Sequence, residues 1–177
     1  LTADVGSSYE SRDSGLLPTT LWSSSYYTPV STPSSVGTST GTDTTVWLYN
    51  PGTSSITVTY QRRNSSGVLT TSTVSVPAGS YAKQVLENPT NGTGARFYTS
   101  GAPFYAYSTT DSNNATSPYS SNQAWDWSFT LVPENALTPQ ILVGLGIGRD
   151  PTSGTNPSEN GNPIWVTTVG NGNTAVT

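Results

Sequence analysis

The side chains that could perform acid–base chemistry in this chain are ten carboxylates, because the sequence contains no His and no Cys. This absence excludes Ser–His–Asp catalysis, cysteine nucleophiles, disulfides and zinc sites with His or Cys ligands. A glycosidase would need two carboxyl groups roughly 5 to 9.5 Å apart across a cleft. No spacing links any two of them, and Glu87 and Glu134 both lie at turn positions near proline. We therefore expect that the protein is not an enzyme.

Lys83 is the only lysine in the chain. It lies in an expected strand, two residues after Tyr81, so that both side chains share the outward face. An isopeptide bond to an asparagine would require an apolar setting beside a buried acid. We expect instead that Lys83 is a solvated side chain on a sheet face.

Calcium is the metal that suits this chain best, since only oxygen ligands are available. One loop cluster contains Asp111 and Asn113, and another contains Asp150 and Glu159. Neither has the spacing of an EF-hand, and short polar side chains in turns usually bond their own backbone. We expect no cofactor, with calcium as the alternative.

Three Asn-X-Ser/Thr triplets lie in polar, turn-like segments and are candidates for N-glycosylation. They begin at Asn64, Asn91 and Asn114. Such triplets also arise by chance in a chain rich in these residues.

The composition favours a location outside the cell. Charged residues make up 9% of the chain, against about 25% in an average soluble protein. Ser and Thr, 27 and 30 residues, make up roughly a third. The net charge of −4 argues against a nucleic-acid partner, which requires a basic surface. No apolar run approaches the length of about 18 residues that a membrane-spanning helix needs.

Short runs with alternating polarity, separated by Gly, Pro and Asn turns, predict β-strands throughout. The expected strands are residues 20–27, 45–49, 55–61, 68–76, 81–86, 95–100, 104–109, 125–132, 140–147, 164–169 and 174–177. No segment keeps a helical period for three turns. We predict an all-β fold, an antiparallel β-sandwich of immunoglobulin-like or jelly-roll-like type. Residues 1–177 form one domain in this interpretation, with 1–43 as a partly extended N-terminal arm and long polar loops at 28–43 and 150–163.

Aromatic residues are the second group that could carry function. Trp125 and Trp127 share one strand face with Phe129 and Leu131, which indicates core packing. Further rings, among them those of Trp22, Trp47, Tyr105 and Tyr107, remain for other faces. Exposed rings of this kind could stack on sugars or on a neighbouring subunit.

Two features suggest assembly with another chain or module. Gly144 and Gly146 interrupt one face of an apolar strand, which indicates close approach of a ring or backbone. Near the two ends, Val5, Ala175 and Val176 belong to strand-like segments with no evident partner. Three explanations remain open: excision from a longer polypeptide, exchange of a strand with a neighbouring subunit, and fraying.

Four segments resemble the repeating β domains of IgG-Fc-binding-type proteins, large secreted or surface-anchored microbial proteins. They are TTVWLYNPGTSSITVTY (44–60), STVSVPAGSY (72–81), GARFYTSGAPFYAY (94–107) and NPIWVTTVGNGNTAVT (162–177). The resemblance implies an extracellular structural or adhesive role and transfers no catalytic residue.

The leading hypothesis is a structural subunit or module of an extracellular filament, sheath or surface adhesin. Its partners would be further copies of itself or adjacent modules of a longer chain, joined through strand edges. The first alternative is a carbohydrate-binding module that uses exposed Tyr or Trp rings. The second alternative is a carboxylate-dependent glycosidase.

Overall fold

The computed structural model describes residues 2–4, 11–13, 15–28, 42–63, 66–86, 94–112, 127–140, 166, 169 and 175–176. Among these residues, no helix has the length and apolar character needed to cross a membrane. The described elements, in chain order, are β1 (Thr2–Asp4), β2 (Ser11–Asp13), η1 (Thr19–Leu21), β3 (Ser25–Thr28), β4 (Thr42–Asn50), β5 (Ile56–Arg63), β6 (Leu69–Val76), β7 (Ser80–Val85), β8 (Ala95–Tyr98), β9 (Tyr105–Ser112), β10 (Trp127–Thr130), β11 (Val132–Pro133) and η3 (Glu134–Ala136).

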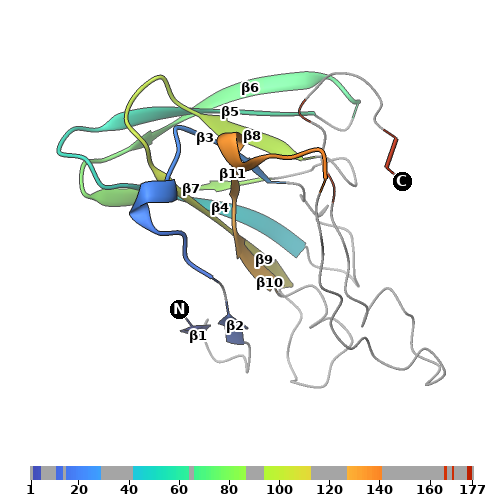
Figure 1. Cartoon of the computed structure of the whole chain (residues 1–177), viewed down its shortest axis with the longest axis horizontal. Helices are drawn as coiled ribbons and strands as arrows, with labels where there is room; N and C mark the ends of the chain where they lie inside the picture. Colours follow the sequence, from blue (N-terminus) through green and yellow to red (C-terminus); the bar gives the residue numbers. More distant parts are fainter. Residues whose placement is uncertain are drawn as a thin grey trace.

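Two antiparallel sheets pack face to face (Figure 1). One sheet has the strand order β10-β9-β4-β7, and the other has the order β11-β3-β8-β5-β6. A separate small hairpin joins β1 to β2. The prediction of an all-β antiparallel sandwich is therefore confirmed, while the choice between immunoglobulin-like and jelly-roll-like types stays a prediction.

The core lies between the sheets and follows from strand alternation. In β4, Val46 and Leu48 are fully buried, whereas Trp47 and Tyr49 between and after them face outward. Burying an aliphatic side chain of this size stabilises the fold by roughly 1.5–3 kcal/mol. The buried core residues come from both sheets and from the segments that join them: Tyr26, Val46, Leu48, Val58, Val76, Leu86, Ala95, Phe97, Phe104, Ala106 and Leu131.

A buried asparagine joins two turns at one end of the sandwich. Asn50 is 1% exposed, and its Nδ2 donates to the carbonyl oxygens of Ser54 (2.8 Å), Val76 (3.1 Å) and Pro77 (3.2 Å). Its Oδ1 accepts a hydrogen bond from the Gly52 amide at 2.9 Å. The turn after β6 requires Gly79, whose φ of +60° is a left-handed conformation. These contacts set the ends of β4 and β7, which carry Tyr49 and Tyr81.

The expected strand at residues 20–27 is wrong in its first half. The chain forms the single turn η1 there, with the Leu21 amide donating to Pro18 O at 2.8 Å. The strand in this range is β3, and all four of its residues are buried. β3 lies inside the five-stranded sheet between β8 and β11, although it falls within the range 1–43 expected to be a partly extended arm.

The expected strand at residues 125–132 is divided between the two sheets. β10 pairs with β9, and after Leu131 the chain crosses to pair with β3 as β11. Phe129 packs against the core and Leu131 is fully buried, which confirms the core role predicted for these two residues. Trp125 and the Trp127 side chain lie outside the described part.

Most of the last three expected strands lies outside the described residues. At Ala175 and Val176 the expected strand is wrong, because these residues are exposed and adopt no strand conformation. A short extended segment is stable as a strand only when a neighbouring strand pairs with it.

Candidate functional site

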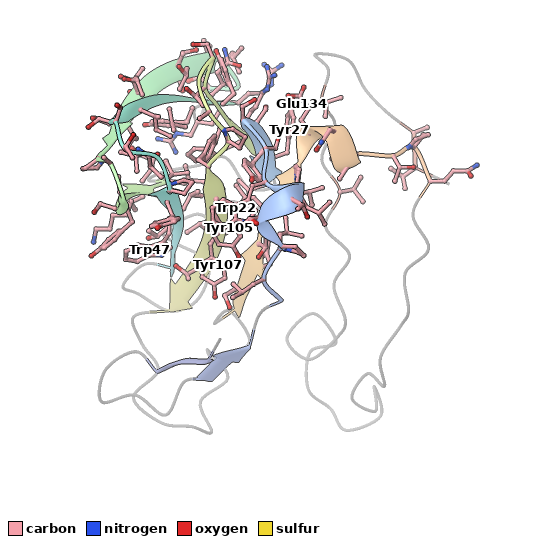
Figure 2. All side chains as sticks on the ribbon, turned by 60° about the vertical axis from the view of Figure 1, so that its left-hand side comes forward. Trp22, Tyr27, Trp47, Tyr105, Tyr107 and Glu134 are labelled. Atoms are coloured by element: carbon pink, nitrogen blue, oxygen red, sulfur yellow. The ribbon has the colours of Figure 1, made fainter. Side chains whose placement is uncertain are left out.

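The outward side of the four-stranded sheet carries a cluster of aromatic rings. Alternation turns Trp47 and Tyr49 of β4 to this side, and the antiparallel register places Tyr81 of β7 and Tyr105 of β9 opposite Tyr49. We call the following set the aromatic face: Leu16, Trp22, Trp47, Tyr49, Tyr81, Tyr105 and Tyr107. Figure 2 shows Trp47, Tyr105 and Tyr107 toward the same region, with Trp22 beside Tyr105.

A shallow hollow of about 190 Å³ opens in the aromatic face. Its side-chain walls are aliphatic or aromatic, and it is lined by Leu16, Trp47, Leu48, Tyr49, Tyr81, Tyr105 and Tyr107. Typical small-molecule pockets measure roughly 300–1,000 Å³. The hollow is therefore suited to one small ring or side chain rather than to a large enclosed ligand.

Hydrogen bonds hold several of these rings in place. Trp47 Nε1 donates to Thr109 Oγ1 at 3.0 Å, and Trp22 Nε1 donates to Leu17 O at 3.0 Å. Trp22 also contacts Tyr49 edge-on, with ring centroids 6.1 Å apart, and Tyr105 at 5.3 Å. Rings fixed in this way lose little conformational freedom when a ligand binds.

Tyr105 is held by a chain of hydroxyl groups. The Thr130 hydroxyl donates to Gly15 O at 2.7 Å, so the Tyr105 hydroxyl is the donor in its 2.6 Å bond to Thr130 Oγ1. Burial raises the pKa of Tyr105, and the nearby Tyr107 raises it further, while the hydrogen bond with Thr130 lowers it. The phenol is therefore protonated at neutral pH and keeps this donor role.

Tyr81 is the most open ring of the aromatic face, with 63% of its surface exposed, and Tyr49 is 39% exposed. The Tyr81 ring lies 5.8 Å from Trp47 at an interplanar angle of 49°. The two rings therefore form an angled pair and not one flat platform. In the described part of the chain neither tyrosine hydroxyl has a hydrogen-bond partner, so both are available to a ligand.

Lys83 lies at the border of the aromatic face. Its side chain is exposed, and Nζ stands 5.7 Å from the centroid of the Trp47 ring. This arrangement confirms the interpretation of Lys83 as a solvated side chain on a sheet face. The contact with Trp47 is a cation–π interaction, which at exposed sites contributes about 0.5–1 kcal/mol.

A polar cluster around Arg96 of the five-stranded sheet stabilises the fold and lies apart from the aromatic face. Arg96 Nη2 pairs with Glu134 Oε2 at 2.8 Å, and its guanidinium stands 4.6 Å from the centre of the Tyr98 ring and 5.6 Å from that of Tyr27. Hydrogen bonds from Ser25 and then from Arg96 lower the pKa of Glu134. The ion pair fastens η3 to β8, in agreement with the turn position inferred for Glu134. Figure 2 shows Glu134 beside Tyr27 and away from the aromatic face.

Most predicted site residues lie outside the described part of the chain. This holds for the calcium candidates Asn113, Asp150 and Glu159, the glycosylation candidates Asn64, Asn91 and Asn114, and the assembly candidates Val5, Gly144 and Gly146. Asp111 lies in β9, but its side chain is not described. Within the described residues, no group of three or more His, Cys, Asp or Glu side chains is placed to hold a metal ion.

Leu16, Tyr49 and Tyr81 belong to the face but were not among the candidate site residues that the sequence indicated. The signal was present in the alternation of VWLYN (46–50), which puts Trp47 and Tyr49 on the side opposite Val46 and Leu48.

Comparisons with protein-family models, curated proteins and solved structures found no match to this chain.

Proposed function

We propose that this protein is a non-catalytic extracellular binding module that holds a sugar ring of a glycan against the aromatic face. The observation that carries the proposal is the open Tyr81 ring beside an apolar hollow of about 190 Å³. The low proportion of charged residues in the chain and its abundant hydroxyl side chains support a location outside the cell. The resemblance to surface-anchored microbial modules supports the same location.

The chemistry of the face suits a sugar. One side of a pyranose ring presents C–H groups, which pack on the face of an aromatic ring, while its hydroxyls need polar partners. Tyr side chains offer both an apolar body and a polar tip. The walls of the hollow would contact the C–H groups, and the Tyr49 and Tyr81 hydroxyls would meet the sugar hydroxyls.

The expected affinity is weak. A hexose has roughly 12 heavy atoms, so at about −0.3 kcal/mol per atom binding amounts to about −4 kcal/mol, a dissociation constant near 1 mM. Useful binding then requires several modules or several sugar units acting together. That requirement fits a module that is present in many copies on a surface.

Among the described residues, no pair of carboxyl groups for hydrolysis lines the hollow; the register of β4 and β9 pairs Asp43 with Asp111, four residues along these strands from Trp47 and Tyr107. Glycoside cleavage needs a pair of carboxyl groups at the sugar, and none of the residues that line the hollow is a carboxylate. Glu134, the carboxylate whose contacts the structure describes, lies in η3 and pairs with Arg96 of the other sheet.

The test is binding to a multivalent glycan array, followed by NMR titration of the strongest ligand. Tyr81→Ala removes the open ring and should abolish binding without unfolding the protein, since the side chain is largely exposed. Tyr81→Phe keeps the ring and should keep most of the binding. Leu69→Ala is the matched control, because Leu69 is 48% exposed but lies on the other sheet. Absence of binding to any glycan, or binding that Tyr81→Ala leaves unchanged, would overturn the proposal.

A second candidate function is self-assembly through the edge strand β6. Within the described residues, β6 has a hydrogen-bonded neighbour, β5, on one side only. Its eight residues include no charged side chain and no proline, which are the devices that usually protect an edge from pairing. This observation supports the role of a filament or adhesin subunit.

Assembly predicts particles larger than one chain in light scattering and ordered polymers in electron microscopy. Thr73→Lys, at an exposed position of β6, should weaken them, because antiparallel β6 pairing would bring like charges together. A protein that stays monomeric at high concentration would contradict this function and leave the glycan-binding proposal intact.

A further inference from the structure

Lys83 gives the aromatic face a positive charge beside its most open ring. Lys83 and Tyr81 lie two residues apart on β7, so their side chains project from the same side at a spacing of roughly 7 Å. The Lys83 ammonium lies over Trp47, which also contacts Tyr81. A ring stacked on Tyr81 would thus have a cation at its edge.

Among the side chains that the structure describes, no carboxylate pairs with Lys83. The neighbours of Lys83 on the same side are Tyr81 and Val85 on its own strand and Thr45, Trp47 and Tyr49 on β4, and none of them is a carboxylate. Glu134, by contrast, pairs with Arg96 on the other sheet. Lys83 therefore keeps its ammonium protons available to an anion from outside.

We propose that the ligand of the aromatic face is an acidic glycan, in which the carboxylate of a uronic acid or similar sugar pairs with Lys83. The inference rests on the proposed function and names its class of ligand. The sugar ring packs on Tyr81 while its carboxylate accepts hydrogen bonds from Lys83 Nζ. Trp47 holds the ammonium near this place before the ligand arrives.

A competing explanation is that Lys83 only protects an edge. β7 is the last strand of its sheet in the described structure, and lysine on an edge strand discourages pairing with other chains. Protection of the edge predicts no dependence of glycan binding on the charge of the sugar. The two explanations therefore differ in a measurable quantity.

The experiment compares uronic-acid oligosaccharides with their methyl esters, which keep the rings and remove the charge. An exposed ion pair predicts about two- to fivefold tighter binding of each acid than of its ester. The difference should shrink at 1 M salt, where the Debye length falls from about 10 Å at 0.1 M to about 3 Å.

Lys83→Gln should abolish the preference for the acid while the ester still binds, and Lys83→Arg should keep the preference. Arg63→Gln is the matched control: it removes the same charge from β5 on the other sheet and should leave the preference unchanged. Equal binding of acid and ester, or a preference that survives Lys83→Gln, would refute the acidic ligand while leaving the glycan-binding function standing. Binding of neither the oligosaccharides nor any other glycan would refute both.

Discussion

Replacement of Asn50 by alanine should destabilise the fold strongly. The side chain is almost fully buried, donates to three carbonyl groups and accepts from the Gly52 amide. Leaving a buried polar group unpaired costs about 1–3 kcal/mol, and a hydrogen bond that water can replace contributes about 0.5–1.5 kcal/mol. Of the four groups that Asn50 contacts, the Val76 carbonyl is buried. Water reaches the Ser54 carbonyl, the Pro77 carbonyl and the Gly52 amide more easily. With each cost at the lower end of its range, we expect a loss of at least about 2.5 kcal/mol in the free energy of unfolding.

Urea denaturation followed by tryptophan fluorescence measures this loss. With an m-value of about 2 kcal/mol/M, the midpoint should fall by at least about 1.2 M with little change in slope. Ser54→Ala is the control, because Ser54 accepts the Asn50 hydrogen bond with its backbone carbonyl. Removal of its exposed side chain should change the free energy of unfolding by less than about 0.5 kcal/mol. A loss below about 1 kcal/mol for Asn50→Ala would show that the two turns hold together without the asparagine, and the reasoning would be wrong.

The remaining predictions concern one buried hydroxyl and one ion pair. Ser108 Oγ is buried with no hydrogen-bond partner, so Ser108→Ala should leave stability unchanged or raise it by up to about 1 kcal/mol; a clear loss in thermal unfolding would reveal a partner. Hydrogen bonds from Ser25 and Arg96 lower the pKa of Glu134 in the folded protein. The ionised Glu134 therefore contributes its full stabilisation of the fold at pH values above the ordinary pKa of 4.5. This stabilisation is lost as the pH falls through the lower pKa of the folded protein. Wild type and Glu134→Gln should then differ in urea midpoint at pH 7 and converge below the folded pKa, and a constant difference would contradict the assignment.

The strands that could be predicted from the sequence are those whose pattern matches their surroundings. Residues 45–49 alternate cleanly, and the structure places β4 around them with the expected faces. β4 extends further in both directions, because Thr42 pairs with Ser112 of β9 and Asn50 pairs with Ser80 of β7. Polarity alone does not mark such an end, since the backbone hydrogen bonds come from the neighbouring strand.

The strands expected at residues 125–132 and 20–27 differ from the structure because alternation of polarity does not reveal which strands pair. Residues 125–132 read as one strand, yet β10 and β11 belong to different sheets, because the chain crosses between layers at Leu131. Residues 20–27 contain a single helical turn before β3. Alternation gives the side on which a residue points, whereas the change of sheet depends on which strands are available to pair.

The candidate site shows the same division. The alternation of Trp47 and Tyr49 against Val46 and Leu48 was readable in the sequence, and so was the placement of Tyr81 and Lys83 on one side of β7. The sequence could not say which tyrosines would be open, and the structure buries Tyr26 completely while it leaves Tyr81 largely exposed.

The amino-acid sequence by itself determined that this chain folds into layered β-strands, because a period of two in polarity admits no other regular structure. The tertiary structure alone decided which rings gather into one surface. Residues 49, 81 and 105 are distant in the chain, and they meet because the register of β7, β4 and β9 aligns them in one row. Strand register is set by pairing between segments far apart in sequence, and no local pattern encodes it.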